Sequence, residues 1–279
     1  MGRLSNSKQL ASASWGVLKA DKELMTIPVI GAVVAGVVAI VVGAVVYATL
    51  ETSTNAAGET TTSANPAAVV LGILGLLIVA VVTQLFAGAL VAGANERFEG
   101  GNPTLGSSFS KAMTRFGSIV GWTATNATVG VILSAVREKA GFLGDIVVGI
   151  IGAAWNIVTW LVMPVIIVEG IGPLAATKRS AVLIKSKWGE NLIAQGGLGL
   201  FGLLLLLPGV IVGVAISSAL PIVGIPLLVL YLAIAFTVLS ALGAIFRTAL
   251  YRFSAGLPVG DAFSESMLVG TFGAKGTGR

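Results

Sequence analysis

Six long apolar runs divide the chain, and short polar or charged segments separate them. The runs cover residues 27–50, 67–91, 119–136, 143–168, 192–219 and 223–246. Most contain the roughly 20 residues that an α-helix needs to cross a hydrocarbon core about 30 Å thick. Strands of a membrane barrel would instead alternate polar and apolar residues. The pattern therefore predicts an all-α polytopic membrane protein with six transmembrane helices in a single integral membrane domain, residues 1–279.

The fifth run has two interpretations because Pro208 interrupts it. It is either one kinked helix or a span that ends near Leu207 and is followed by a short apolar segment, residues 210–220. That segment has 11 residues, which are too few to cross the membrane unaided. Both interpretations keep the total at six spans.

The basic residues test this count and predict an orientation. All of the 17 Lys and Arg residues except Arg137 and Lys139 fall in four segments, namely residues 1–24, the link after the second run, the link after the fourth run, and the tail that begins with Arg247. Basic residues concentrate on the cytoplasmic side of membrane proteins. We therefore expect both termini in the cytoplasm of a prokaryotic cell and the chain in its cytoplasmic membrane. The link after the first run lacks Lys and Arg and is expected to be a flexible outside loop.

Composition agrees with a membrane location. The chain is 56% hydrophobic and 10% charged, whereas soluble domains carry about 25% charged residues. The formal net charge of +5 is spread beside apolar runs, so anionic lipid headgroups are the expected partner and nucleic acid is not. A protein partner or a homo-oligomer stays open.

Three of the cytoplasmic segments share one layout, in which a Gly-Pro region leads to an aromatic residue followed by Gly. They read GNPTLGSSFSKAMTRFG, GPLAATKRSAVLIKSKWG and GLPVGDAFSESMLVGTFG. Each has the features of an amphipathic helix in the headgroup region, although Leu183 and Ile184 fall off the expected apolar stripe. The first cytoplasmic segment, SKQLASASWG, ends in the same way at Trp15 and Gly16 but lacks the proline. The four segments predict three repeats of an interfacial helix and two spans, with a final interfacial helix. The segment GPLAATKRSAVLIKSKWG supplies candidate lipid-headgroup contacts: Lys178, Arg179, Lys185 and Lys187.

A joint between two repeats is expected at residues 164–173. Pro164 removes one backbone hydrogen bond and crowds the carbonyl of Trp160, which breaks or loosens a helix. Pro173 then starts the next helix. Glu169 is expected at the cytoplasmic boundary, paired with a basic residue such as Lys178 or Arg179. The alternative is a buried carboxylate that binds a cation or carries protons.

Three stretches of the chain resemble a known group of proteins. They are SWGVLKADKELMTIPVI, MPVIIVEGIGPLAATKRSAVLIKSKWGE and YRFSAGLPVGDAF. They look like an uncharacterised family of six-span prokaryotic membrane proteins and, more distantly, like the membrane domain attached to some glycerophosphodiester phosphodiesterases. The most specific element is Pro-x4-Glu-Gly followed by a helix with Ala176 and Ser180. The resemblance implies a fold and a location but no activity, since the phosphodiesterase domain is absent here.

Candidate chemistry is sparse. The chain has no Cys and no His, which excludes thiol catalysis, the usual general base and nearly all zinc sites. The carboxylates are dispersed, and Asp145 is expected to form a surface ion pair with Arg137 or Lys139. We therefore expect no catalytic residue, no metal site and no cofactor. Small residues four positions apart predict close helix packing instead, as at Ala32/Gly36, Ala39/Gly43, Ala89/Gly93 and Gly149/Ala153.

A layer of carboxamides inside the spans is the remaining candidate site. Gln84, Asn126 and Asn156 lie within apolar runs and need hydrogen-bonding partners there. They either bond to one another between helices or line a path for a small solute. The first interpretation favours a non-enzymatic structural, assembly or partner-binding protein with a basic cytoplasmic face. The alternative is a channel or transporter, which a continuous water-accessible cavity reaching Asn126 would favour over a filled bundle.

Overall fold

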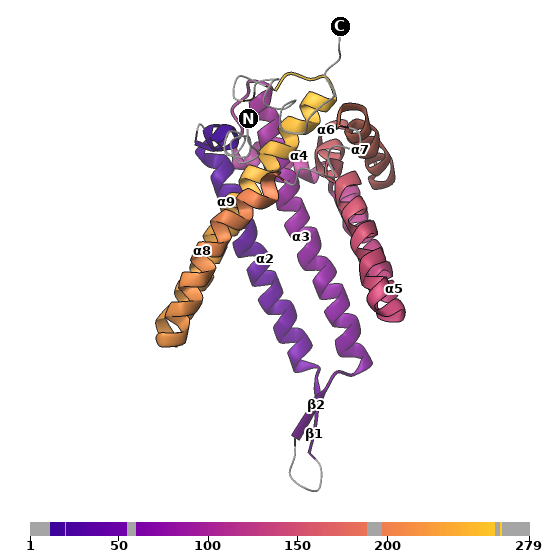
Figure 1. Cartoon of the computed structure of the whole chain (residues 1–279), viewed down its shortest axis with the longest axis vertical. Helices are drawn as coiled ribbons and strands as arrows, with labels where there is room; N and C mark the ends of the chain where they lie inside the picture. The colour runs from indigo at the N-terminus through magenta and orange to yellow at the C-terminus, as the bar shows by residue number, and fades with distance from the viewer. Residues whose placement is uncertain (1–11, 20, 55–59, 189–196, 260–262, 264–279) are drawn as a thin grey trace.

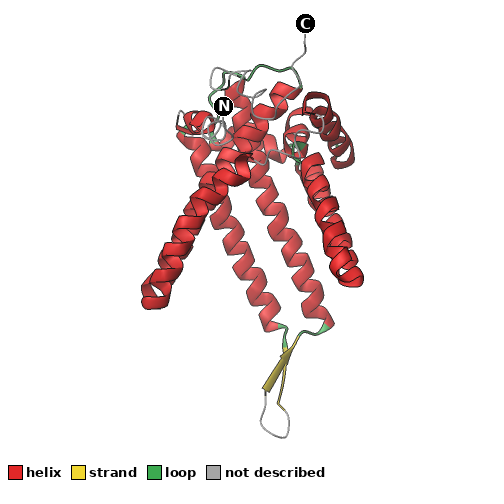
Figure 2. Ribbon diagram, viewed as in Figure 1, coloured by secondary structure: helices red, strands yellow, loops and turns green. Residues whose placement is uncertain are grey.

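The computed structural model describes residues 12–19, 21–54, 60–188, 197–259 and 263. Apart from one small hairpin, its elements are helices (Figures 1 and 2). Residues 12–19 are helical and are followed by α2 (Lys22–Ala48), β1 (Glu51–Thr54), β2 (Thr60–Ser63), α3 (Pro66–Phe98), α4 (Leu105–Met113), α5 (Phe116–Val158), α6 (Val162–Glu169), α7 (Pro173–Trp188), α8 (Gly197–Ala219) and α9 (Pro221–Ser254). The expected all-α class is therefore correct at the level of the fold.

Five helical stretches of the described chain are long and apolar enough to cross a membrane. They are Glu23–Ala48, Pro66–Phe98, Phe116–Lys139, Gly144–Glu169 and Pro221–Ser254. The protein is therefore a membrane protein. In the region of the expected fifth span, α8 runs through Pro208 without ending, and residues 206–219 form a shorter apolar helix. Residues 192–196, where that span was expected to begin, lie outside the described chain.

The long helix α5 is a hairpin of two antiparallel halves. Gly141, with φ 52° and ψ −142°, is the non-helical residue between them. Trp122 stacks on Trp155 across the hairpin, with ring centroids 6.1 Å apart. Near the turn, Arg137 Nε lies 3.2 Å from Asp145 Oδ1 in an exposed ion pair. The polar residues at the turn thus sit at the outer tip of an apolar hairpin.

The core lies where the short helices α4, α6 and α7 gather, which we call the short-helix end (Figure 1). Six of the eight residues of α6 are buried, Val162 through Ile167. The C-terminal half of α3 and the last third of α9 complete the core with residues such as Leu90, Ile245 and Tyr251. Burying apolar side chains there stabilises the fold by about 25 cal/mol per Å².

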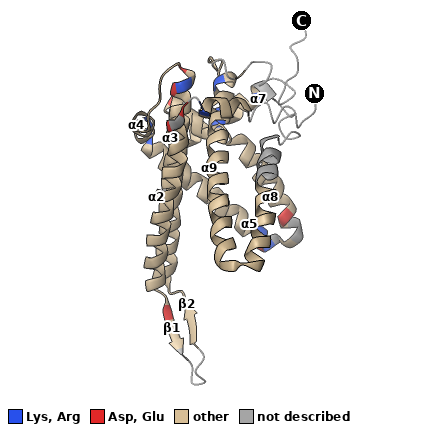
Figure 3. Cartoon of the chain, turned by 90° about the vertical axis from the view of Figure 1, so that its left-hand side faces the viewer, with Lys and Arg blue, Asp and Glu red and all other residues tan. Residues whose placement is uncertain are grey.

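At the opposite end the helix pairs diverge from one another, and we call this the open end (Figure 1). Large apolar side chains are exposed along these segments, among them Ile40, Leu76 and Ile222. Charged residues gather toward the ends of the helices and leave their lengths apolar (Figure 3). Exposed apolar surface of this extent is stable only against lipid.

The link between α2 and α3 projects from the open end as a two-stranded antiparallel sheet. Glu51 pairs with Ser63 and Thr54 with Thr60, where a flexible loop had been expected. β-branched Thr residues favour an extended backbone, and Ser53 and Thr61 hydroxyls lie 3.1 Å apart across the strands. The Thr-rich composition therefore indicates strands as well as a polar surface.

The expected joint is present, and its helix break precedes Pro164. α5 ends at Val158, and α6 begins at Val162. Pro164 is the third residue of α6, where its missing N–H is tolerated. α6 then ends at Gly170, whose φ of 71° gives a left-handed cap, and α7 begins at Pro173.

A serine on α7 satisfies the backbone at this break. Ser180 is fully buried; its hydroxyl donates to the Val158 carbonyl at 2.5 Å and accepts from the Leu161 N–H at 3.2 Å. Ala176, one turn earlier, is also fully buried and lets α7 approach closely. Leu183 and Ile184 continue this buried face, so the expected apolar stripe on this helix was placed wrongly.

Candidate functional site

The three predicted carboxamides line one cavity of about 440 Å³. Gln84 comes from α3, and Asn126 and Asn156 come from the two halves of α5. Trp122, Trp160 and Met163 complete much of the wall. Residues more than 40 positions apart in the sequence are thus brought to one space near the short-helix end. A cavity of this size is within the range of small-molecule sites, about 300–1,000 Å³.

The carboxamides do not bond to one another, which contradicts the expectation of a mutually satisfied layer. The Trp155 indole Nε1–H donates to Asn126 Oδ1 at 2.9 Å. No hydrogen bond joins the side-chain amide of Gln84 or of Asn156 to another described residue. The amides of these two residues therefore stay available to whatever occupies the cavity.

Arg247 on α9 is the functional residue that the predicted site lacked. It lines the carboxamide cavity together with Gln84 and Asn156. Protein atoms surround its side chain on most sides, yet its surface is exposed. The cavity opens beside the guanidinium, so a ligand can reach it.

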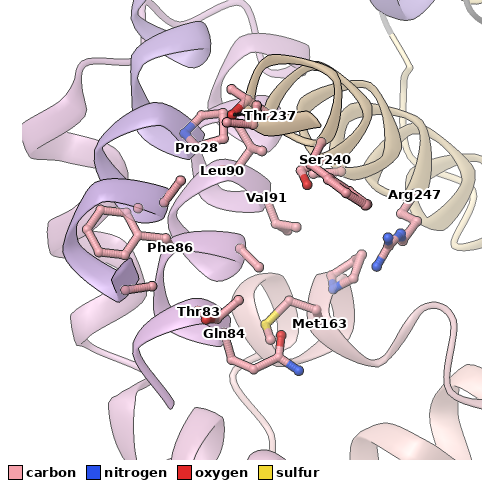
Figure 4. Close-up of a pocket in the computed structure, with 18 residues that line it drawn as sticks. Pro28, Thr83, Gln84, Phe86, Leu90, Val91, Met163, Thr237, Ser240 and Arg247 are labelled. Atoms are coloured by element: carbon pink, nitrogen blue, oxygen red, sulfur yellow. Dashed lines mark hydrogen bonds between the residues drawn. The ribbon is translucent and has the colours of Figure 1, made fainter. Parts of the chain in front are cut away.

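A second cavity of about 420 Å³ is also lined by Arg247. Its walls come from α2, α3, α6 and α9, and most of them are apolar or small: Pro28, Gly31, Ala32, Ala35, Phe86, Ala87, Leu90, Val91, Ala233, Phe236 and Ala244. Gln84, Met163 and Arg247 line both cavities. Figure 4 shows Gln84 and Met163 near one another, with the guanidinium of Arg247 directed into the same space.

A periodic stripe on α9 leads to Arg247. Ala233, Thr237, Ser240, Ala244 and Arg247 all line the apolar cavity and recur every three or four residues, so they share one helix face. The predicted sixth span ended at residue 246, and Arg247 was assigned to the basic tail. The helix instead continues to Ser254, and this stripe was the sequence signal for the site.

A second arginine of α9, Arg252, is already paired at the short-helix end. Arg252 is 4% exposed; its Nη1 donates to Asn95 Oδ1 at 2.7 Å and to Glu99 Oε1 at 3.1 Å, and its Nε donates to the Pro258 carbonyl at 2.7 Å. These bonds tie the end of α9 to the end of α3. Arg252 therefore stabilises the fold, in contrast with Arg247.

Glu169, the predicted joint residue, lies in a separate cluster. Its Oε1 accepts from Arg179 Nε at 2.9 Å and from the Tyr251 hydroxyl at 3.1 Å. The pair with Arg179 is one of those expected from the sequence, whereas Tyr251 was not. Glu169 thus fastens α6 to α7 and α9 and does not line either cavity.

The candidate headgroup contacts on α7 have different environments. Lys178 and Lys185 are exposed, whereas Arg179 is half-buried against Glu169. The side chain of Lys187 lies outside the described part of the chain. Only the first two are therefore free, within the described structure, to meet a headgroup.

Among the described residues, no Asp, Glu, His or Cys lines either cavity, and no group of three or more such residues could hold a metal ion. The walls of the carboxamide cavity offer amide and indole groups and one guanidinium. Such groups bind polar or anionic groups by hydrogen bonds and charge.

Comparison with known proteins gives a family without an assigned role. No curated protein matches the sequence. Residues 66–260 match the family of unknown function DUF6159, and this region includes both halves of α5, the joint and Arg247. Because the match covers most of the chain, the protein belongs to this family of unknown function.

Proposed function

We propose that the chain is a non-enzymatic, multi-pass protein of the cytoplasmic membrane that binds a ligand in the carboxamide cavity. The observation that carries the proposal is the convergence of Gln84, Asn156 and Arg247, from three elements, on one cavity. Each of the three has a polar group without a hydrogen bond or ion pair to another described residue. Polar groups inside a membrane protein are costly unless they are used or paired.

Ligand binding explains the cavities better than a purely structural role does. A scaffold needs a filled bundle, because each void in a core costs packing energy. Here two cavities, of about 440 and 420 Å³, flank the core. Their presence supports a site that is built to be occupied.

Ligand binding also fits better than a channel. A water-filled path must be walled off from lipid along its whole length. α5 packs against α3, α6 and α7, and toward the open end it diverges from α3 and α9 (Figure 1). Among the described residues, helices therefore enclose the carboxamide cavity near the short-helix end and do not enclose it toward the open end. Such a site favours a ligand that enters from the bilayer.

We also propose the finer architecture and the orientation of the chain. The fifth apolar run, residues 192–219, is a membrane span of which α8 is the described part, and the helices form three repeats, with α4 and α7 each preceding a pair of apolar helices. The final interfacial helix lies outside the described residues. The short-helix end faces the cytoplasm, where Lys178 and Lys185 meet anionic headgroups. The distant relation to the phosphodiesterase-associated membrane domain concerns the fold alone.

Cysteine accessibility tests the proposed site, and the natural absence of Cys removes background labelling. Asn156→Cys places a thiol in the carboxamide cavity, and Ile150→Cys places one on a surface that is 66% exposed and apolar. In liposomes of zwitterionic lipid, a small hydrophilic thiol reagent should label position 156 at least about tenfold faster, because thiolates form and react in polar surroundings. Equal, slow labelling at both positions would mean that lipid or protein fills the cavity.

A further inference from the structure

Arg247 is a cation placed inside a membrane-spanning helix without a protein counter-charge. It lies seven residues before Ser254, the last residue of α9, or about 10 Å along the helix axis at 1.5 Å per residue. Among the described carboxylates, Glu169 pairs with Arg179, Glu99 with Arg252 and Asp145 with Arg137, and none lies within ion-pair distance of Arg247. An unpaired guanidinium at this depth attracts an anion.

The apolar cavity beside Arg247 has the character of a site for a hydrocarbon chain. Small residues such as Ala32 and Ala35 on α2 and Ala233 on α9 leave the space open, and Leu90, Val91 and Phe236 supply apolar walls. In Figure 4 these walls lead from Pro28 and Phe86 toward the guanidinium. One ligand can therefore place an apolar part between α2 and α9 and a charged part at Arg247.

The carboxamide cavity, which Arg247 also lines, suits a polar head. Gln84 and Asn156 offer both N–H donors and carbonyl acceptors, and the Trp122 and Trp160 rings form flat, partly polar walls. Hydroxyl and ester oxygens find partners there. A free inorganic anion would use Arg247 but would leave the apolar cavity without a role.

We propose that the ligand is an anionic phospholipid, with its acidic head at Arg247 and the carboxamides and one acyl chain in the apolar cavity. This inference rests on the proposed function, because it names the ligand of the same site. The lipid arrives sideways through the gap between the helix pairs. The head group is net anionic because the guanidinium has no other counter-charge among the described residues.

Lipid retention measured by native mass spectrometry tests the inference. The purified full chain is equilibrated with equal amounts of phosphatidylglycerol and phosphatidylcholine that carry the same acyl chains, and the lipids that remain after detergent washing are counted. The parent should retain phosphatidylglycerol in preference to phosphatidylcholine. Arg247→Gln should lower that preference roughly fivefold or more, the effect of one cation near anionic lipid.

Matched variants separate the cavity from the basic surface and from misfolding. Lys178→Gln with Lys185→Gln removes two exposed cations outside both cavities and should leave the tightly held lipid in place. Arg247→Lys keeps the charge and should keep the preference.

Ala32→Phe fills the apolar cavity and should reduce retention of both lipids, whereas Ala39→Phe, on the exposed part of the same helix, should not. If Arg247→Gln does not fold, lipid retention by Ala32→Phe and Arg247→Lys still tests the proposed lipid site.

Three results would overturn the inference. The first is an unchanged preference in folded Arg247→Gln, and the second is equal retention by Ala32→Phe and the parent. The third is displacement of the retained lipid by soluble glycerol phosphate, which would assign the site to a free anion. If the parent holds both lipids equally while Asn156→Cys stays reactive, the anionic head group is wrong and the proposed site remains. If the parent retains neither lipid and Asn156→Cys labels no faster than Ile150→Cys, the site itself is wrong.

Discussion

Ser180 shows how a single polar side chain holds a helix break inside a membrane protein. Its hydroxyl bonds both the Val158 carbonyl and the Leu161 N–H, which belong to the turn between α5 and α6. The Leu161 N–H has no access to water, since Ser180 and Leu161 are both fully buried, and Val158 is half-buried. The same residue is the serine of the Ala-x-x-x-Ser element noted in the sequence, whose purpose is thus structural.

Replacing Ser180 with Ala should destabilise the fold. The buried Leu161 N–H would lose its partner without gaining water, at a cost of about 1–3 kcal/mol, and the half-buried Val158 carbonyl would lose a hydrogen bond as well. Thermal unfolding in detergent measures the loss. Ser186→Ala is the matched control because the hydroxyl of Ser186 bonds only the Leu183 carbonyl of its own helix. Equal losses in the two variants would show that the break does not depend on Ser180.

Asp21, just before α2, should make stability depend on pH. Burial raises the pKa of its carboxyl above 3.8, although Arg97 lowers it in part, and its Oδ2 has no hydrogen-bond partner. The folded protein therefore holds this proton to higher pH than the unfolded chain does. The resulting stabilisation is present below pH 3.8 and is lost as pH rises through the folded-state pKa.

Asp21→Asn tests this assignment because it removes the titration and keeps the size of the side chain. Melting temperatures of the parent and the variant are compared between about pH 4 and pH 7. On acidification the parent should gain stability relative to Asp21→Asn. A parent that loses stability relative to the variant as pH falls would mean that the carboxylate is favourably paired.

At the scale of elements, the hairpin of α5 is fastened by one aromatic pair and one hydrogen bond. Trp122 stacks on Trp155, and the indole of Trp155 donates to Asn126. The nearby Thr123, Thr125 and Thr128 hydroxyls donate to carbonyls of their own helix. Cross-hairpin bonding therefore depends on Trp155, whereas the sequence pointed to Asn156.

A double-mutant cycle distinguishes these two partners of Asn126. Asn126→Leu and Trp155→Phe should show a coupling free energy of about 0.6 kcal/mol, the mean for hydrogen bonds between membrane helices. Asn126→Leu and Asn156→Leu should be additive, because the structure has no bond between those side chains. The reverse pattern in measured unfolding free energies would restore the mutually bonded layer.

Elements were predictable where the signal is local. Hydropathy located the apolar helices, and Pro164, Gly170 and Pro173 located the joint, because backbone geometry follows from those residues themselves. The helix faces that pack against other helices could not be predicted in this way. A Cβ on Gly93 would contact Ser108 and Leu24, but Gly36, Gly43 and Gly149 have no neighbour within 4 Å. A small-residue spacing does not say whether another helix lies opposite it.

At the scale of the whole molecule, the two ends have different chemistry. The short-helix end holds the buried core and the ion pairs of Arg252 and Arg179, whereas the open end exposes apolar helices and a Thr-rich hairpin. We expect the short-helix end in the cytoplasm because basic residues concentrate there. The hairpin then lies outside the cell.

Labelling of intact cells tests this orientation. Ser53→Cys on β1 should react with a membrane-impermeant thiol reagent, and Lys178→Cys on α7 should react only after the cells are permeabilised. Both positions are exposed in the structure, so accessibility does not differ for local reasons. The opposite pattern would invert the topology and place the cavities near the outer surface.

Part of the candidate site could be predicted from the sequence. Gln84, Asn126 and Asn156 stand out in the sequence because carboxamides are rare in apolar spans. Arg247 does not, since the sequence cannot say that α9 continues beyond residue 246 or that Arg247 lines one cavity with Gln84 and Asn156. Contacts between distant segments decide the site, and a single sequence carries little information about them.

The most direct test of the ligand site is protection of a thiol placed inside it. Asn156→Cys is reconstituted in liposomes of phosphatidylcholine alone and of phosphatidylcholine with phosphatidylglycerol, and an uncharged thiol reagent is added. Lys185→Cys, on the exposed face of α7, reports any general effect of the lipid surface. A ligand that occupies the cavity shields the thiol there and not at position 185.

We expect the labelling rate at position 156 to fall several-fold as phosphatidylglycerol is added, while the rate at position 185 is unchanged apart from the surface effect. Adding Arg247→Gln to Asn156→Cys should abolish the protection, because the anion would lose its counter-charge. Rates at position 156 that do not depend on lipid composition, in a protein whose thermal stability is normal, would contradict an anionic lipid as occupant of the cavity.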